Sequence, residues 1–104
     1  MNLIFNYGII KNDKVIGDVA IYSHPQDNRG GQVHIFIKPE WRKKWLSKFI
    51  AKEILSNLSK FAQLHNISTI YSTALTEISP RILEFFGFTE YYKKQPKTYY
   101  YLKI

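Results

Sequence analysis

The stretch Gln32–His65, QVHIFIKPEWRKKWLSKFIAKEILSNLSKFAQLH, decides the fold of this chain. Its first part, Val33–Ile37, is mostly β-branched or aromatic and predicts a buried strand. Pro39 cannot donate a ladder hydrogen bond, so it ends this strand. From Leu46 onward, apolar residues recur three or four positions apart, which predicts a long amphipathic helix. The predicted core-facing stripe consists of Leu46, Phe49, Ile50, Ile54, Leu58, Phe61 and His65.

The turn between this strand and helix, Glu40–Lys44, is strongly basic, with the cations Arg42, Lys43 and Lys44 in succession. The first N–H groups of a helix have no intrahelical acceptor, and the helix dipole makes this end positive. An anionic phosphate fits such a position. The alternative interpretation is a solvated basic turn in which Trp45 anchors the core.

The run Ile37–Ser47, IKPEWRKKWLS, resembles the strand-turn-helix signature of the GNAT superfamily of acyl-CoA-dependent N-acetyltransferases. That signature is an aliphatic residue, any residue, Pro, two residues, then Arg or Gln-x-x-Gly-x-Gly or Ala. A second segment, Pro80–Phe88, is similar to the helix of this family that ends in Gly-Phe. The order of elements agrees from about Asn2 to Ile104. The chain resembles a small, degenerate member of the superfamily, of the kind that phages encode.

The resemblance implies acetyl-CoA as the cofactor, with its pyrophosphate on the backbone of Lys43–Lys48 and its pantetheine arm along Ile35–Ile37, between two diverging strands. Arg42 matches the Arg or Gln of the signature, Trp45 falls on its first glycine, and Ser47 falls on its Gly or Ala. An indole at this glycine position blocks the phosphate unless its ring turns into the core. The expected cofactor-binding residues are Ile35, Ile37, Arg42, Lys43, Lys44, Trp45, Leu46, Ser47 and Lys48.

Amide-forming transfer needs a base for the acceptor amine and an acid for the leaving thiolate. The position of the Tyr that the family often uses as its acid is Leu83, and the position of its frequent Asn partner is Thr76. The candidate catalytic residues are therefore His34, whose ordinary pKa of ~6.5 suits a base, Glu40 as an alternative base, and Tyr71. Further candidates for the missing acid are Ser72, Glu84, Tyr91 and Tyr92. The non-catalytic interpretations are a half-buried strand histidine for His34 and a solvated carboxylate at the helix N-terminus for Glu40.

The remaining segments predict an α+β sandwich. We expect a GNAT-like mixed, mainly antiparallel sheet with a long central helix and a short C-terminal helix, lacking the usual N-terminal strand and helices of the family. Asn12-Asp13 closes the first hairpin, Gly17 marks a bulge or a close backbone approach, and Asn66 ends the long helix. The predicted elements are a strand at Leu3–Ile10, a strand at Val15–Tyr22, an exposed mobile loop at Ser23–Gly31, a strand at Ile67–Thr73 parallel to Val33–Ile37, a helix at Ser79–Phe86 capped by Ser79 and Gly87, and a hairpin of Phe88–Lys94 and Thr98–Ile104.

Composition bounds the possible functions. The chain has 104 residues and no cysteine, and this length predicts one domain, residues 1–104. Its formal charge of +7 favours acidic partners. No apolar run approaches the ~20 residues of a membrane span, and no signal peptide is evident, so we expect a cytoplasmic protein without a membrane partner. His24, His34 and His65 lack ligand spacing, so no metal site is expected.

The Tyr-rich C-terminal hairpin interleaves aromatic and basic residues. Such sets stack on bases and neutralise phosphates in nucleic-acid binders, and tyrosines are also common at protein interfaces. The hairpin therefore supports two further partners, nucleic acid or a second copy in a homodimer. The alternative function to acetyl transfer is a catalytically inactive, basic GNAT-fold module that binds nucleic acid or a protein.

Overall fold

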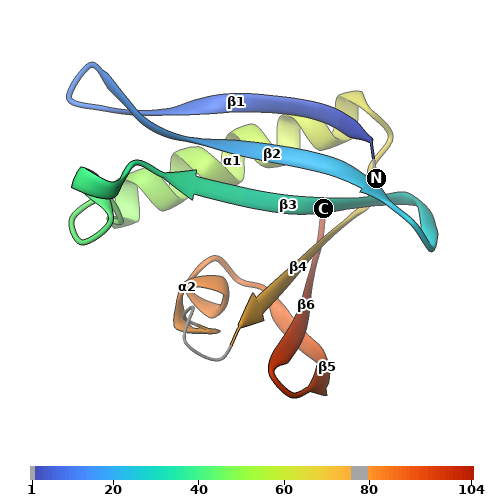
Figure 1. The fold of residues 1–104 in the computed structure, drawn as a ribbon. Helices are drawn as coiled ribbons and strands as arrows, with labels where there is room; N and C mark the ends of the chain where they lie inside the picture. The colour runs from blue at the N-terminus through green and yellow to red at the C-terminus, as the bar shows by residue number, and fades with distance from the viewer. Residues whose placement is uncertain (1, 76–79) are drawn as a thin grey trace.

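The computed structural model describes residues 2–75 and 80–104 and places them in one six-stranded sheet with two α-helices (Figure 1). The strand order is β1-β2-β3-β4-β6-β5, and every neighbouring pair is antiparallel except β3 and β4. This confirms the predicted α+β class and the mixed, mainly antiparallel sheet. The elements are β1 (Leu3–Lys11), β2 (Lys14–His24), β3 (Asp27–Ile37), the 3₁₀ turn η1 (Pro39–Trp41), α1 (Lys48–Leu64), β4 (Thr69–Leu75), α2 (Pro80–Phe85), β5 (Thr89–Lys94) and β6 (Lys97–Lys103).

Local chemistry explains the first hairpin. Asn12 and Asp13 have φ angles of 53° and 61°, the left-handed values that a tight hairpin turn requires and that Asn and Asp tolerate. The register shifts between Ile9 and Ile10, beside Gly17. A Cβ on Gly17 would lie 2.1 Å from the backbone oxygen of Phe36, so both the predicted bulge and the predicted close approach are confirmed.

The prediction of a mobile loop at residues 23–31 is wrong. β2 continues to His24 and β3 begins at Asp27, with Ser23 opposite Gly31. Gly30 and Gly31 look like turn residues in the sequence, but both are buried in β3 because other side chains need their space. A Cβ on Gly31 would lie 2.6 Å from Ile21, and one on Gly30 would lie 2.7 Å from Tyr71.

The long helix begins later than its apolar pattern predicts. α1 starts at Lys48 rather than Leu46, because the Ser47 hydroxyl accepts a hydrogen bond from the Ile50 N–H and so caps the helix. Phe49, predicted to face the core, is 67% exposed in the first turn. The predicted end is confirmed, since Asn66 has φ 58°. The buried positions of α1 are Ile50, Ala51, Ile54, Leu58 and Ala62.

The central feature of the sheet is the divergence of its parallel strands. β3 and β4 pair only where Gly30, Gly31 and Gln32 lie opposite Thr69, Ile70 and Tyr71. Beyond Gln32, β3 continues along β2, while β4 continues along β6. Figure 1 shows β4 and β6 turning away from β3. The predicted divergence of two central strands is therefore present, and its vertex lies at Gln32 and Tyr71.

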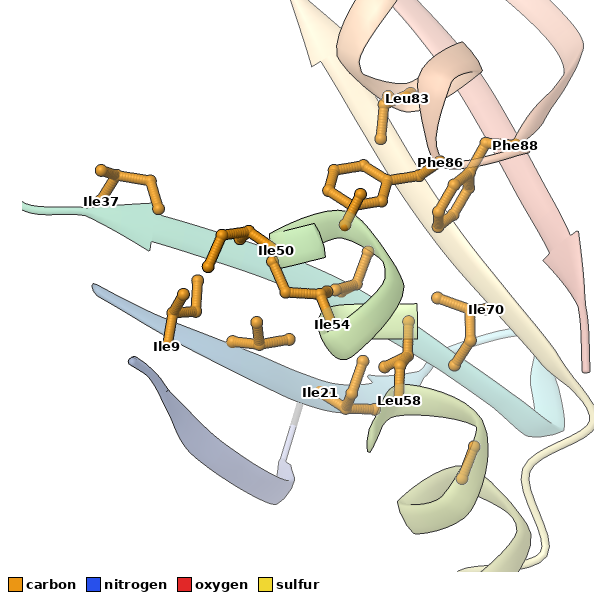
Figure 2. Close-up of a cluster of buried hydrophobic side chains, with 14 of the residues drawn as sticks. Ile9, Ile21, Ile37, Ile50, Ile54, Leu58, Ile70, Leu83, Phe86 and Phe88 are labelled. Atoms are coloured by element: carbon orange, nitrogen blue, oxygen red, sulfur yellow. The ribbon is translucent and has the colours of Figure 1, made fainter. Parts of the chain in front are cut away.

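One face of the sheet is packed beneath the helices, and the other is exposed. In Figure 2, Ile9 and Ile21 from the sheet point toward Ile50, Ile54 and Leu58 of α1, while Leu83 of α2 and Phe86, just after α2, approach the same cluster. Gly87 has φ 89°, as predicted for its cap of α2, whereas the predicted cap Ser79 lies outside the described residues. Strand alternation turns Gln32, His34 and Phe36 of β3 toward the opposite face.

Candidate functional site

A run of free backbone donors lies between β3 and α1. Within residues 2–75 and 80–104, the consecutive N–H groups from Trp45 to Phe49 have no hydrogen-bond acceptor. The next N–H, that of Ile50, is bonded to the Ser47 hydroxyl, and Ala51 begins the regular helical ladder. Free N–H groups at the positive end of a long helix favour an anion. We call residues 45–49 the amide run.

Contacts from β1 and β3 hold the amide run in place. The Lys11 Nζ donates to the Lys44 carbonyl oxygen at 2.8 Å, and it lies 3.5 Å from the Trp45 carbonyl oxygen. Lys11 and Lys44 also lie 6.0 and 5.0 Å from the centroid of the Trp41 ring. These contacts connect the turn before α1 to the end of β1. Sequence reasoning did not identify Lys11, which lies far from the turn along the chain.

The predicted phosphate-binding cations have different surroundings. The Arg42 Nε donates to the Ile37 carbonyl oxygen at 3.3 Å, so this side chain fastens the turn to the end of β3. Lys44 lies against Trp41. Lys43 and Lys48 are exposed, and Lys48 is the first residue of α1. All four cations are exposed and lie between the end of η1 and the first residue of α1, so the structure brings them together beside the amide run.

The indole of Trp45 is turned into the core. The residue is only 6% exposed, and its ring lies nearly parallel to that of Phe86, with centroids 6.5 Å apart. The contact joins the segment before α1 to the segment that follows α2. The structure therefore agrees with the interpretation of Trp45 as a core anchor. Its N–H has no acceptor within residues 2–75 and 80–104. Leu46 is partly buried against the same core.

The residues predicted to line the pantetheine arm lie past the vertex of the diverging strands. Ile35 is half-buried, Ile37 is buried, and both belong to the helix-facing side of β3. On the side toward β4, the β3 backbone beyond Gln32 has no strand partner among the described residues. This free strand edge offers main-chain donors and acceptors to an extended ligand.

The structure does not bring the three candidate catalytic residues together. Tyr71 lies at the vertex, His34 is exposed on the outer face of β3, and Glu40 is exposed in η1 beyond the far end of that strand. At ~3.3 Å per strand residue, Glu40 is more than ~16 Å from the vertex. The His34 ring packs edge-on against Tyr22, with centroids 5.1 Å apart. As for the family positions, Leu83 is 9% exposed and buried in the core, and Thr76 lies outside the described residues.

Tyr71 is held by a carboxylate. Its hydroxyl donates to the Asp27 Oδ2 at 2.7 Å. This hydrogen bond, together with burial, raises the pKa of Tyr71 to about 12. The same bond and the Arg29 backbone N–H hold the pKa of Asp27 below its usual value. A phenol with so high a pKa is a weak proton donor at neutral pH, so this geometry favours a structural role for the Tyr71 hydroxyl.

A cavity of about 440 Å³ opens at the vertex on the outer face of the sheet. Its walls come from the end of β2, the vertex itself and the C-terminal hairpin. Sequence reasoning did not assemble this site, because its residues meet only through strand register; the available signal was the alternation of tyrosines along β6 opposite β4. The residues that line this cavity include His24, Gln32, Tyr71, Tyr91, Tyr92 and Tyr99.

The described residues also limit other kinds of site. Within residues 2–75 and 80–104 no group of three or more His, Cys, Asp or Glu side chains is placed to hold a metal ion. No helix in the same part of the chain has the length and apolar character to cross a membrane.

Solved structures share the fold of this chain at low sequence identity. The PaiA N-acetyltransferase from Thermoplasma acidophilum, in complex with coenzyme A, matches 100% of this chain with a TM-score of 0.72 and 14% identity. The N-acetyltransferase PseH from Campylobacter jejuni, in complex with acetyl coenzyme A, matches 90% with a TM-score of 0.66 and 15% identity. The GNAT domain of S. lividans PAT matches 95% with a TM-score of 0.70 and 12% identity.

These likenesses show that the chain has the GNAT fold. It spans 62%, 63% and 60% of the three neighbouring chains, respectively. No protein-family model matches the sequence, and no curated protein sequence matches it.

Proposed function

We propose that the chain is an N-acetyltransferase that binds acetyl-CoA at the amide run and passes the acetyl group to an amine. The observation that carries this proposal is the set of free N–H groups from Trp45 to Phe49 at the start of α1, beside the diverging strands β3 and β4. Two of the neighbouring structures with this fold contain coenzyme A or acetyl coenzyme A. The residues present fit such a group, since the amide run offers donors and the indole of Trp45 is turned into the core.

The amide run is suited to the pyrophosphate. Successive N–H groups and the helix dipole both favour negative charge, and Lys43 and Lys48 add exposed cations. Arg42 serves by positioning the turn, because its Nε is already bonded to the Ile37 carbonyl oxygen. The pantetheine arm would follow Ile35–Ile37, where the free edge of β3 can pair with its amide groups.

Bound acetyl-CoA would supply a thioester whose carbonyl carbon forms a bond to the acceptor nitrogen as its bond to sulfur breaks. The chain would contribute mainly by holding the two reactants together at the vertex. The buried Leu83 offers no proton, and the Tyr71 hydroxyl is committed to Asp27. His34 and Glu40 stay predictions as bases. A direct role is less favourable for Glu40, because it lies farther from the vertex than His34 does.

A charge reversal at the amide run tests coenzyme binding. In Lys48→Glu, a carboxylate at the first position of α1 suits the helix dipole but repels a pyrophosphate. Two unit charges ~4 Å apart interact by ~1 kcal/mol in water; the reversal changes this twice, so affinity for acetyl-CoA should fall by at least about tenfold. The matched control is Lys60→Glu, also exposed on α1 but ~18 Å along the helix.

Calorimetric titration of both variants with acetyl-CoA and coenzyme A gives the answer. We expect the parent and Lys60→Glu to bind alike and Lys48→Glu to bind weakly. Absence of binding to the parent at millimolar acetyl-CoA would contradict the proposal. Equal losses in the two variants would show that net charge, rather than the amide run, holds the ligand.

A second function, binding without catalysis, is favoured by the core positions of Trp45 and Leu83, which stand where the family signature has a glycine and an acid. The outermost strand β5 is exposed along its whole length and offers a free edge to a second copy or another protein. In this case acetyl-CoA would bind without forming coenzyme A in the presence of amines. Binding of a generic oligonucleotide that weakens steeply with salt would identify the nucleic-acid version.

A further inference from the structure

The cavity at the vertex has aromatic walls whose ring planes meet at angles from 34° to 73°. Tyr91 is the hub: its ring centroid lies 6.1 Å from that of Tyr71 at 73°, and 6.3 Å from that of Tyr99 at 54°. Tyr92 lies 5.5 Å from Tyr99 at 42°, and His24 lies 4.2 Å from Tyr71. A flat ligand needs nearly parallel rings between which to stack. Rings that converge from several directions instead surround a compact group.

The register explains why these rings share one face. Tyr71 is opposite Tyr101, and Thr73 is opposite Tyr99, so alternate β6 tyrosines point outward while Tyr100, between them, is buried. A register irregularity between Glu90 and Tyr92 leaves Tyr91 unpaired in β5 and lets both Tyr91 and Tyr92 contact the rings of β6. We call Tyr71, Tyr91, Tyr92 and Tyr99 the tyrosine cage; their arrangement follows from the geometry of the hairpin and its register with β4.

The charge beside the cage favours a cation. The Tyr71 hydroxyl donates a hydrogen bond to the Asp27 carboxylate at 2.7 Å, so a negative charge lies next to the hydroxyl end of the Tyr71 ring. The electron-rich faces of tyrosine rings attract cations as well. His24 and Lys103 are the other titratable groups that act on Asp27. The His24 Nδ1 accepts a hydrogen bond from the Gln26 N–H, so its neutral ring carries the proton on Nε2.

The geometry points to this tyrosine cage as the acceptor site, and to a primary alkylammonium group as the ligand class that it takes. The assignment rests on the proposed acetyl transfer for its role as acceptor, but the binding of a cation is independent of it. The floor of the cavity includes Gln32 and Tyr71, the last paired residues before β3 and β4 separate. A group held there lies where the free edge of β3 begins, on the side of the sheet away from α1.

A bound alkylammonium first releases one proton to water and becomes a neutral amine. Its nitrogen forms a bond to the acetyl carbon, the carbon–sulfur bond breaks, and the second proton passes from nitrogen to the coenzyme thiolate. The products are an N-alkyl acetamide and the free thiol.

Choline tests the cage without requiring any coenzyme. Its control is the neutral alcohol of the same shape in which carbon replaces the nitrogen. We expect choline to shift the aromatic NMR signals of Tyr91 and Tyr99 and to bind at least about threefold more tightly than the neutral alcohol, as expected for a cation–π contribution. Equal affinity of the two probes would overturn the proposal, as would the absence of any shift with choline.

Matched variants separate the ring from its hydroxyl. Tyr91→Phe keeps the ring and should retain choline affinity within about twofold, whereas Tyr91→Leu should lose at least about threefold. Tyr91 is 50% and Tyr92 53% exposed, so Tyr92→Leu serves as a second ring deletion if Tyr91→Leu fails to fold. A loss in Tyr91→Phe as large as in Tyr91→Leu would contradict the cage, since it would make the hydroxyl the binding group.

Acetyl-CoA titration of the same samples keeps the two proposals apart. If the parent binds acetyl-CoA but fails to prefer choline over its neutral isostere, the cage is wrong and coenzyme binding stands. If it binds choline but no acetyl-CoA, the cage stands as a cation site and its acceptor role falls. Where turnover is measurable, n-butylamine should be acetylated faster than aniline, and the reverse order would overturn the ligand class.

Discussion

Replacing Trp45 by alanine separates the two interpretations of this residue, as a core anchor or as an obstruction of the phosphate site. The indole is 6% exposed and lies against Phe86. A buried Trp removes up to ~250 Å² from water, which at ~25 cal/mol/Å² gives an upper bound of ~6 kcal/mol. Measured truncations of buried Phe or Trp to Ala cost about 3–5 kcal/mol, and we expect a loss in that range.

Such a loss is large beside a total stability of roughly 5–15 kcal/mol for a natural domain. At roughly 4–8 °C per kcal/mol for a small domain, the melting temperature should fall by at least ~12 °C. Urea titration gives the free energy of unfolding directly, and an unchanged m-value would show that the two-state description still holds. The control is Trp41→Ala, since Trp41 is half-buried and contacts Lys11 and Lys44 at the surface; its loss should be clearly smaller.

The same variant must also be titrated with acetyl-CoA at a temperature where it is folded. If the indole lies in the core, its removal leaves the affinity unchanged or lowers it through a looser turn. A loss of less than ~1 kcal/mol on unfolding, together with a gain in affinity, would refute this reasoning and would identify Trp45 as the group that closes the site.

Two further perturbations test the sheet and the vertex. Gly17→Ala places a Cβ 2.1 Å from the Phe36 backbone oxygen and should cost about 1–3 kcal/mol in urea titration, whereas Gly8→Ala, whose Cβ has 3.5 Å to Val15, should be neutral or stabilising by about 0.4–1 kcal/mol; equal effects would contradict the register at Gly17. Asp27→Asn should lower the pKa of Tyr71 from about 12 toward the ordinary tyrosine value of 10.0, as followed by NMR of the Tyr71 ring. Because the folded-state pKa of Tyr71 is raised, its contribution to stability is fully present below pH ~10 and lost as pH rises toward 12, so the parent should lose more stability over that interval than Asp27→Asn.

Local chemistry allowed much of the fold to be predicted from the sequence. The strand, proline and helix around Pro39 follow from patterns within a few residues, and so do the left-handed residues Asn12, Asp13 and Asn66. α1 begins two residues later than the apolar periodicity predicts, because the capping hydroxyl of Ser47 sets its start. Such features are decided within one turn of chain, so their sequence signal is strong.

Features set by distant contacts were predicted poorly. The local sequence predicts a mobile loop at Gly30 and Gly31, but in the structure their small size leaves room for Tyr71 and Ile21, which approach from other strands. Lys11 reaches the turn before α1 from the first hairpin. The tyrosine cage needs the β4–β6 register and the irregularity in β5. None of these pairings can be read from local spacing.

The divergence of β3 and β4 gives the two proposed sites a common origin. Had the strands stayed paired beyond Gln32 and Tyr71, the edge of β3 would have no free main-chain groups, and the vertex would offer no cavity floor. The amide run lies beyond the end of β3, while the tyrosine cage lies at the vertex on the outer face of the sheet. A donor extended along β3 would therefore bring its reactive end to the acceptor cavity, although within residues 2–75 and 80–104 no hydrogen bond or ring contact joins the two sites. Lys48→Glu and Tyr91→Leu should for this reason act independently, each weakening one ligand and leaving the other bound as in the parent, and a strong mutual effect would mean that the two ligands share one site.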